Sequence, residues 1–191
     1  MRDKCFIHTA KVLLVAFLAL SILAWSLPLQ AEGPALTILA GSGIPEKADG
    51  QLEKAGFNTP YGLTVDSQGR IYVADSYNNC IRVIANGTVS TVAGSSKGTD
   101  AYGFPLGGFS DGDVNQARFN KPRAVVVDGQ DTIYVADTGN NVIRKIANGK
   151  VTTYAGTGKA GFRNGSAREA QFNAPSGLPL TRPATFMWPI P

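Results

Sequence analysis

Carboxylate side chains recur along the chain at two fixed offsets. Asp66 and Asp128 each follow a Val, and Asp75 and Asp137 each end an Ile-Tyr-Val-Ala-Asp run. Carboxylates in such positions can ligate metal ions or act as general acids and bases. They can equally accept backbone N–H hydrogen bonds in a following turn. Because catalytic groups normally break repeat symmetry and turn-stabilising groups obey it, we interpret these four residues as structural.

Two further pairs of polar residues share the spacing. Arg82 and Arg144 alternate with apolar neighbours, and Asn79 and Asn141 lie three residues before them. An Arg on a strand can face a ligand, but its fixed fork of donors also suits turn carboxylates and carbonyls. Asn tolerates the left-handed conformation that a tight turn requires. We expect all four to hold the fold.

Other chemistry has weaker support. Asp111-Gly112-Asp113 resembles part of a calcium loop, but its spacing does not match the EF-hand pattern. His8 is the one histidine and lies in the N-terminal segment, so histidine triads and histidine-ligated metals are not expected beyond it. Cys80 has no nearby partner and is expected to be a small buried side chain. We therefore expect no catalytic residue, no cofactor and no metal.

The N-terminal segment has the pattern of an export signal. Three basic residues precede the apolar run Val12–Leu27, and Leu29-Gln30-Ala31 leads into a polar stretch. We expect a signal peptide over 1–31 and a periplasmic, extracellular or cell-surface protein. The alternative is a membrane anchor formed by residues 12–29, although the apolar run is slightly short for a spanning helix.

The charge of the remaining chain is nearly balanced. Without residues 1–31 it has 15 Lys and Arg against 13 Asp and Glu, and no run of more than two adjacent basic residues. Nucleic-acid binding depends on a basic patch that tracks the phosphates, so a nucleic-acid partner is not expected. A membrane partner is expected only if the N-terminal segment is retained.

An internal repeat dominates the rest of the sequence. Segments 57–94 and 119–156 align without a gap, and partial copies occur at 36–41 and 172–178. The first full unit predicts four short strands from β-branched and aromatic runs between turn residues. These strands are Tyr61–Val65, Arg70–Ala74, Cys80–Ile84 and Val89–Val92.

A four-stranded meander of this kind cannot bury both of its faces alone. Asn86-Gly87 between two of the strands is a strong hairpin signal, so the strands are expected to be antiparallel. Radial stacking of such sheets gives a β-propeller. We expect an all-β fold of propeller blades, with an incomplete ring of about two and a half blades over residues 32–178.

The repeated runs Phe-Asn-x-Pro, Gly-Leu-x-Val-Asp and Ile-Tyr-Val-Ala-Asp-x-x-Asn-Asn-x-Ile-Arg resemble the NHL repeat. The Ala-Gly…Asp-Gly…Ala-x-Phe-Asn-x-Pro linkers are similar to those of bacterial members, and the resemblance covers about residues 36–178. It implies a propeller, usually six-bladed and TolB-like, but no single activity. Some relatives of this architecture are lyases or lactone hydrolases, and some eukaryotic ones bind RNA.

The main departure from the repeat is an insertion at Ser96–Gly108. Its Tyr102 and Phe104 are candidates for partner contact, because loops on rigid scaffolds carry function and aromatic residues anchor interfaces. The alternative is a tolerated surface insertion. We expect a non-enzymatic exported scaffold for a protein, peptide or glycan. The alternative is the remnant of a lyase-like or lactonase-like propeller enzyme whose catalytic blades are missing.

The repeat pattern stops after Leu178. The tail 179–191 is rich in Pro and shows no strand alternation. With suitable codons and one base restored, the tail reads Ala-Val-Asp-Pro-Ala-Gly-Asn-Ile-Tyr-Val-Ala-Asp-Thr, which continues the repeat. We therefore expect the tail to be a frameshift product and the chain to be a truncated fragment of a longer propeller.

Overall fold

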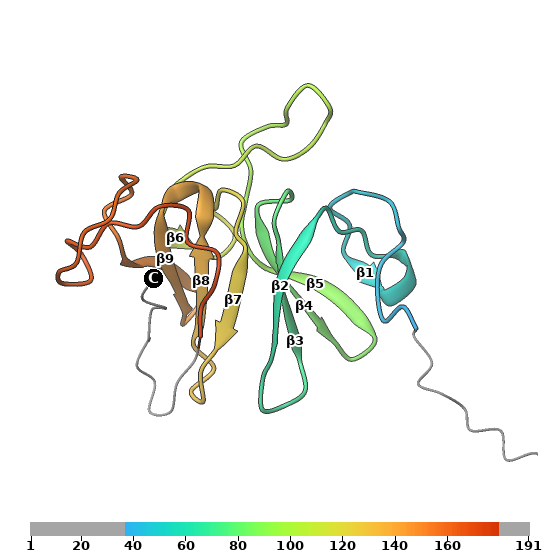
Figure 1. Cartoon of the computed structure of the whole chain (residues 1–191). Helices are drawn as coiled ribbons and strands as arrows, with labels where there is room; N and C mark the ends of the chain where they lie inside the picture. Colours follow the sequence, from blue (N-terminus) through green and yellow to red (C-terminus); the bar gives the residue numbers. More distant parts are fainter. Residues whose placement is uncertain (1–36, 180–191) are drawn as a thin grey trace, which may run out of the picture. The chain divides into compact units, whose positions relative to one another are not determined.

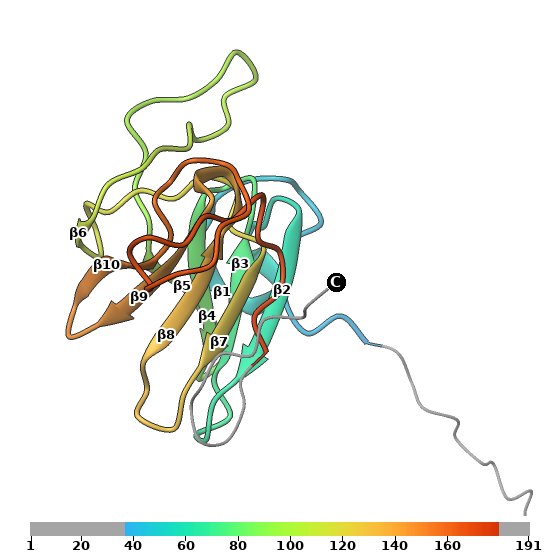
Figure 2. The same ribbon diagram turned by 60° about the vertical axis from the view of Figure 1, so that its left-hand side comes forward.

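The structure, a computed structural model, describes residues 37–179, which form two antiparallel sheets (Figures 1 and 2). The first sheet has the order β1-β5-β4-β3-β2 and the second β6-β10-β9-β8-β7. The first comprises β1 (Gly50–Gln51), β2 (Pro60–Val65), β3 (Ile71–Asp75), β4 (Cys80–Ala85) and β5 (Thr88–Ala93). The second comprises β6 (Gly112–Asp113), β7 (Ala124–Val127), β8 (Ile133–Asp137), β9 (Val142–Ala147) and β10 (Lys150–Ala155).

Helix is almost absent from this part of the chain. The two short 3-10 helices are η1 (Leu52–Lys54) and η2 (Thr138–Asn140). No helix within 37–179 is long and apolar enough to span a bilayer. The expectations for 1–31 and for the tail beyond Pro179 fall outside the described residues.

Strands β2–β5 and β7–β10 are the two predicted meanders, so the all-β blade architecture is confirmed. The short strands β1 and β6 are additional and extend each sheet at its outer edge. Gly50 pairs with Val89, and Gly112 pairs with Val151. Strands of two residues are too short to show an apolar alternation, so the sequence pattern does not reveal them. Residues 37–41 match the end of the repeat unit but form no strand in the described chain.

The tight hairpin turns follow from their Asn-Gly sequences. Asn86 and Gly87 have φ of 50° and 74°, and Asn148 and Gly149 have φ of 51° and 71°. Left-handed conformations at both central positions define the type I′ turn, whose twist matches that of the flanking strands. The predicted hairpins are therefore present in both sheets.

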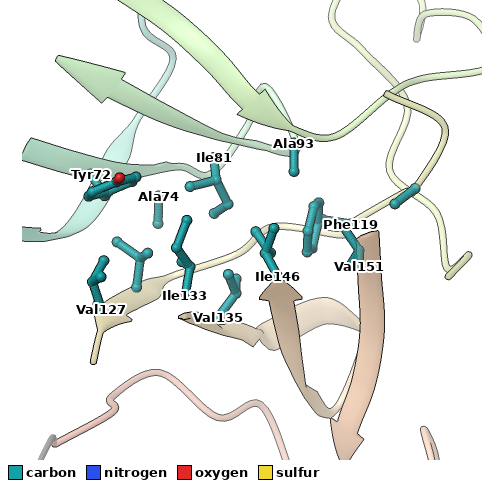
Figure 3. Packing of buried hydrophobic residues seen from close by; sticks show 12 residues of the cluster. Tyr72, Ala74, Ile81, Ala93, Phe119, Val127, Ile133, Val135, Ile146 and Val151 are labelled. Carbon is teal, nitrogen blue, oxygen red and sulfur yellow. The ribbon is translucent and has the colours of Figure 1, made fainter. Parts of the chain in front are cut away.

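The two sheets pack face to face through a shared apolar core (Figure 3). The first sheet contributes Tyr72, Ala74, Ile81 and Ala93, and the second contributes Val125, Val127, Ile133, Val135, Ile146 and Val151, with Ala117 and Phe119 from the linker. Full burial of each Ile or Val stabilises the fold by about 1.5–3 kcal/mol. The blades are therefore held together by one continuous core.

The sheets approach most closely where β2 meets β7. A Cβ atom on Gly62 would lie 2.6 Å from the carbonyl oxygen of Arg123 and 3.0 Å from the Cα of Ala124. On β2, Leu63 and Val65 remain exposed. A smaller cluster, which includes Phe172, covers part of the second sheet. Residues 37–179 therefore hold two adjacent blades and do not close a ring.

Candidate functional site

The two ends of the blades differ in what they carry. One end, the hairpin-turn end, carries the turns at 66–70 and 86–87 and their counterparts in the second blade. The opposite end, here called the linker end, carries the starts of β2 and β7, the β3–β4 and β8–β9 connections and the linker 94–123 (Figure 1). The repeated polar residues and the insertion divide between these ends.

At the linker end of the first blade, a buried guanidinium joins strands to linker. The Nη1 of Arg82 donates to Asp75 Oδ2 at 2.9 Å and to the Gly56 carbonyl at 2.8 Å. Its Nη2 donates to the Ala48 carbonyl and to Asp49 Oδ1, both at 2.7 Å. The side chains of Arg82 and Asp75 have no solvent exposure. Arg82 therefore fixes residues 48–56 against the sheet.

Asp75 accepts two more hydrogen bonds, from the Asn58 backbone N–H and from Asn78 Nδ2, both at 2.8 Å. Burial raises the pKa of Asp75, against the lowering effect of these donors and of Arg82. We expected a backbone donor from the turn that follows Asp75. The donor instead precedes β2, because the antiparallel register places Pro60 opposite Asp75.

The second blade repeats this network. Asp137 accepts from Arg144 Nη1, Asn140 Nδ2 and the Asn120 N–H, each at 2.8 Å. Arg144 Nη2 also donates to Asp111 Oδ1 at 2.6 Å. Burial likewise raises the pKa of Asp137. Asp111, which resembles a calcium-loop residue in sequence, is thus a counter-ion of the buried Arg144.

Asp66 and Asp128 lie at the hairpin-turn end. Asp66 Oδ1 accepts from the Gln68 and Arg70 N–H groups at 2.9 Å, and Asp128 Oδ1 accepts from the N–H groups two and four residues later at 2.9 and 3.0 Å. Although desolvation acts to raise it, hydrogen bonds from Arg70 and Gln68 hold the pKa of Asp66 below its usual value. These carboxylates close the turns that follow β2 and β7.

Asn79 and Asn141 connect successive repeat units. Both are left-handed, with φ of 53° and 56°. Asn79 Oδ1 accepts the Lys121 N–H at 2.8 Å, and Asn141 Oδ1 accepts the Ala174 N–H at 2.9 Å. Asn79 Nδ2 also donates to the Pro105 carbonyl at 2.7 Å. The sequence pattern indicates the turn conformation but not the bond to the next unit.

The remaining chemistry-bearing groups are not assembled into a centre. Within 37–179, no cluster of three or more His, Cys, Asp or Glu side chains could hold a metal ion. Cys80 is fully buried at the start of β4, and burial raises its pKa to about 12. Its thiol is therefore protonated at neutral pH.

The insertion Ser96–Gly108 projects beyond the linker end (Figure 1). Asp100 Oδ1 accepts the N–H groups of Tyr102 and Phe104 at 2.9 and 3.0 Å, and Ser96 Oγ donates to the Leu106 carbonyl at 3.0 Å. Phe104 is half-buried, whereas the Tyr102 side chain is 85% exposed. The loop thus has internal order and presents Tyr102 to solvent.

The buried Arg82 and Arg144 stack on Phe57, Phe109 and Phe119 at the linker end, and two further cation–aromatic pairs there involve tyrosines that are partly exposed. The Arg123 Cζ lies 4.9 Å from the centre of the Tyr61 ring, and the Lys121 Nζ lies 5.2 Å from the centre of the Tyr77 ring. The two tyrosines are 57% and 45% exposed. Neither Lys121 nor Arg123 forms an ion pair or donates a side-chain hydrogen bond to another described residue.

A comparison of the repeat units could have found these residues. Tyr61 and Arg123 occupy the same offset in their two units, as do Thr59 and Lys121, and Tyr77 corresponds to Gly139. The residue types at these positions differ between the two units, whereas the neighbouring Asn, Pro and Asp are the same in both. Single-residue differences within the aligned units thus carry a signal that the insertion alone does not.

The family model of the NHL repeat matches residues 57–84 and 119–146. The chain is an NHL-repeat protein. Both matches begin at the Phe of the Phe-Asn-x-Pro run and end within β4 or β9. They thus span the strands that carry the repeated Asp and Arg residues of each blade.

Two relatives illustrate the extent of the similarity. The NHL repeat-containing protein 2 of Bos taurus is 35% identical over 154 residues, which cover 73% of this chain and 20% of that protein. Protein SUPPRESSOR OF QUENCHING 1, chloroplastic, of Arabidopsis thaliana is 29% identical over 150 residues, which cover 75% of this chain and 14% of the relative. The chain thus spans about a fifth or less of these relatives.

Solved structures share the fold. A Bacteroides thetaiotaomicron protein of unknown function superposes with a TM-score of 0.54 at 26% identity, over 62% of this chain and 29% of that one. An auxiliary nutrient binding protein from Bacteroides ovatus gives a TM-score of 0.54 at 22% identity, over 69% of this chain and 34% of that one. The second similarity shows the fold alone.

Proposed function

We propose that this protein is an exported, non-enzymatic NHL-repeat scaffold that binds a protein, peptide or glycan at its linker end. The observation that carries the proposal is the pair of cation–aromatic contacts at that end, Tyr61 with Arg123 and Tyr77 with Lys121. Exposed aromatic and cationic side chains are typical anchors of binding surfaces. The order within the adjacent insertion supports a second contact through Tyr102.

The engagement of the repeated residues supports the non-enzymatic part of the proposal. Asp75 and Asp137 are each held by a buried Arg, an Asn amide and a backbone N–H. Asp66 and Asp128 accept turn N–H groups. Carboxylates with these partners stabilise the blades, so their recurrence needs no catalytic explanation.

Export is supported by the pattern of residues 1–31 and is tested by the mass of the mature protein. Cleavage after Ala31 predicts an N-terminus at Glu32 and recovery in the exported fraction. Recovery of the uncleaved chain in the membrane fraction would instead favour an anchor over residues 12–29. This outcome would correct the location without affecting the binding proposal.

Binding is tested on arrays of glycans, peptides and secreted proteins probed with the whole chain. We expect at least one class of ligand to bind, and Tyr61→Ala with Tyr77→Ala to abolish that binding. Val65→Ala, which shortens an exposed side chain on β2 away from the linker end, is the control and should bind normally. Equal binding by both variants, or ligand turnover lost on Asp75→Asn or Asp137→Asn alone, would contradict the proposal.

A further inference from the structure

We propose that the two cation–aromatic pairs at the linker end bind an acidic glycan. In this arrangement Lys121 and Arg123 bind uronate carboxylates, and the exposed parts of Tyr61 and Tyr77 contact the sugar rings. The inference rests on the proposed function and specifies the class of ligand. It comes from the charge, exposure and neighbours of these four side chains.

The first argument is electrostatic. Arg82 and Arg144 are buried in ion pairs with Asp75 and Asp137, and Arg70 pairs with Asp66. Lys121 and Arg123 have no carboxylate partner among residues 37–179. An Arg guanidinium presents a planar fork that matches a carboxylate, and a Lys ammonium adds a mobile positive charge. The site is therefore complementary to an anion.

The second argument is that the four residues lie on neighbouring segments. Lys121 and Arg123 flank Pro122 at the entry to β7. The Tyr77 N–H donates to the Asn58 carbonyl at 3.1 Å, which places the β3–β4 turn beside the residues that precede Tyr61. Asn79 in the same turn accepts the Lys121 N–H. One backbone hydrogen bond within the first blade and one side-chain hydrogen bond between the blades thus tie together the segments that carry the two pairs.

The third argument concerns the rings. Each tyrosine is about half exposed and has a cation held over its ring. The negative electrostatic face of an aromatic ring attracts partly positive edges such as the C–H groups of a sugar. The phenol hydroxyls can donate to and accept from sugar hydroxyls. Each unit of a uronate polymer combines a sugar ring, which suits the tyrosines, with a carboxylate, which suits the cations.

Other anionic polymers fit less well. Single-stranded nucleic acid also combines stacking with charge, but its binding relies on a groove of many cations, whereas this site offers two. A run of Asp or Glu would satisfy the cations but has no rings to cover Tyr61 and Tyr77. The site therefore favours a uronate-bearing glycan.

Isothermal titration of the whole chain with a short oligogalacturonate tests the inference. The neutral galactose oligomer of the same length, poly-Glu peptide and poly-U RNA are titrated in parallel. We expect the oligogalacturonate to bind more tightly than the other three, and its affinity to fall as salt is raised. The variant Lys121→Gln/Arg123→Gln should weaken its binding at least tenfold.

The matched control Lys150→Gln/Arg168→Gln makes the same change in net charge at exposed positions elsewhere. It should bind like the unmodified chain, and thermal unfolding should show that both variants are folded. Equal binding of the neutral oligomer, tighter binding of peptide or RNA, no binding of oligogalacturonate, or equal effects of the two variants would overturn the inference. The proposed function would survive these results if the arrays still show a ligand that depends on Tyr61 and Tyr77.

Discussion

Arg82 and Arg144 each hold a positive charge with no solvent exposure, and each is balanced by one buried and one half-exposed carboxylate. Removal of the buried carboxylate leaves the guanidinium with only the half-exposed one, and a buried charge that is incompletely compensated costs more than the pair contributes. The contribution of the repeated residues to the stability of the fold is therefore concentrated in a few side chains at the linker end.

Asp75→Asn tests this directly. The Asn amide is uncharged and leaves the half-exposed Asp49 as the remaining counter-ion of Arg82, so we expect the free energy of unfolding to fall by about 3 kcal/mol, measured by urea denaturation. Asp131→Asn is the matched control, because Asp131 is exposed and left-handed and Asn tolerates that conformation. It should change the free energy by no more than about 0.5 kcal/mol. Similar stabilities for the two variants would show that the buried pair is not needed.

The burial of Cys80 gives a second prediction about a single residue. Because burial raises its pKa to about 12 and leaves the thiol without solvent contact, a thiol reagent at about pH 8 should not label it in the folded chain. With Cys5→Ser in place, labelling should become complete only in denaturant. Rapid stoichiometric labelling of the folded chain would show that β4 opens or that Cys80 is accessible.

The repeat made the pairing of Arg with turn carboxylates predictable, since both types recur at fixed offsets. The identity of the donors was not predictable in the same way. Asp75 binds the N–H of Asn58 because strand register brings together residues that are distant in sequence. The pairing of Tyr61 with Arg123 joins two blades, so it appears only once the sheets are placed side by side.

Strands β2 and β7 lie so close together that position 62 requires a glycine. Gly62 has no Cβ, and one added there would meet the Arg123 carbonyl and the Ala124 Cα. The insertion Ser96–Gly108 is tied to the β3–β4 turn through Asn79. Contacts between elements thus set both the spacing of the blades and the position of the loop.

Gly62→Ala should therefore destabilise the chain by about 1–3 kcal/mol, because the sheets must move apart to admit the methyl group. Gly129→Ala is a suitable control, since nothing lies within 4 Å of its added Cβ and its φ is not left-handed. It should be neutral or slightly stabilising. Equal thermal shifts for both variants would contradict the close approach of β2 and β7.

Asn79→Ala should loosen the insertion. The change removes the hydrogen bonds to Pro105 and Lys121, so trypsin should cleave after the exposed Lys97 several-fold faster. Asn141→Ala removes only the corresponding bond to Ala174 and should leave this cleavage rate unchanged. Identical rates for both variants would show that Asn79 does not hold the loop.

At the scale of the whole described chain, the two blades are consecutive members of a radial array. The second blade buries Val125 and Val127 against the first, while the equivalent residues of the first, Leu63 and Val65, are exposed. The fold class and most strand positions could be predicted, because the apolar alternation and the Asn-Gly turns repeat. The outer strands β1 and β6 could not, because they carry no such pattern.

In the described chain as a whole, the residues that hold the fold can be distinguished from those of the proposed binding surface. Residues that repeat between the blades, such as Asp75 and Asp137, are engaged within the fold, and the two cation–tyrosine pairs, whose tyrosines are about half exposed, occur where the repeat is broken. We therefore propose ligand contact at the linker end and not at the hairpin-turn end.

The most direct test is to map amide chemical shifts by NMR during titration of the chain with a short oligogalacturonate. We predict that the shifts change around Tyr61, Tyr77, Lys121 and Arg123 and remain constant in the turns at 66–70 and 128–132. Changes confined to those turns would contradict it.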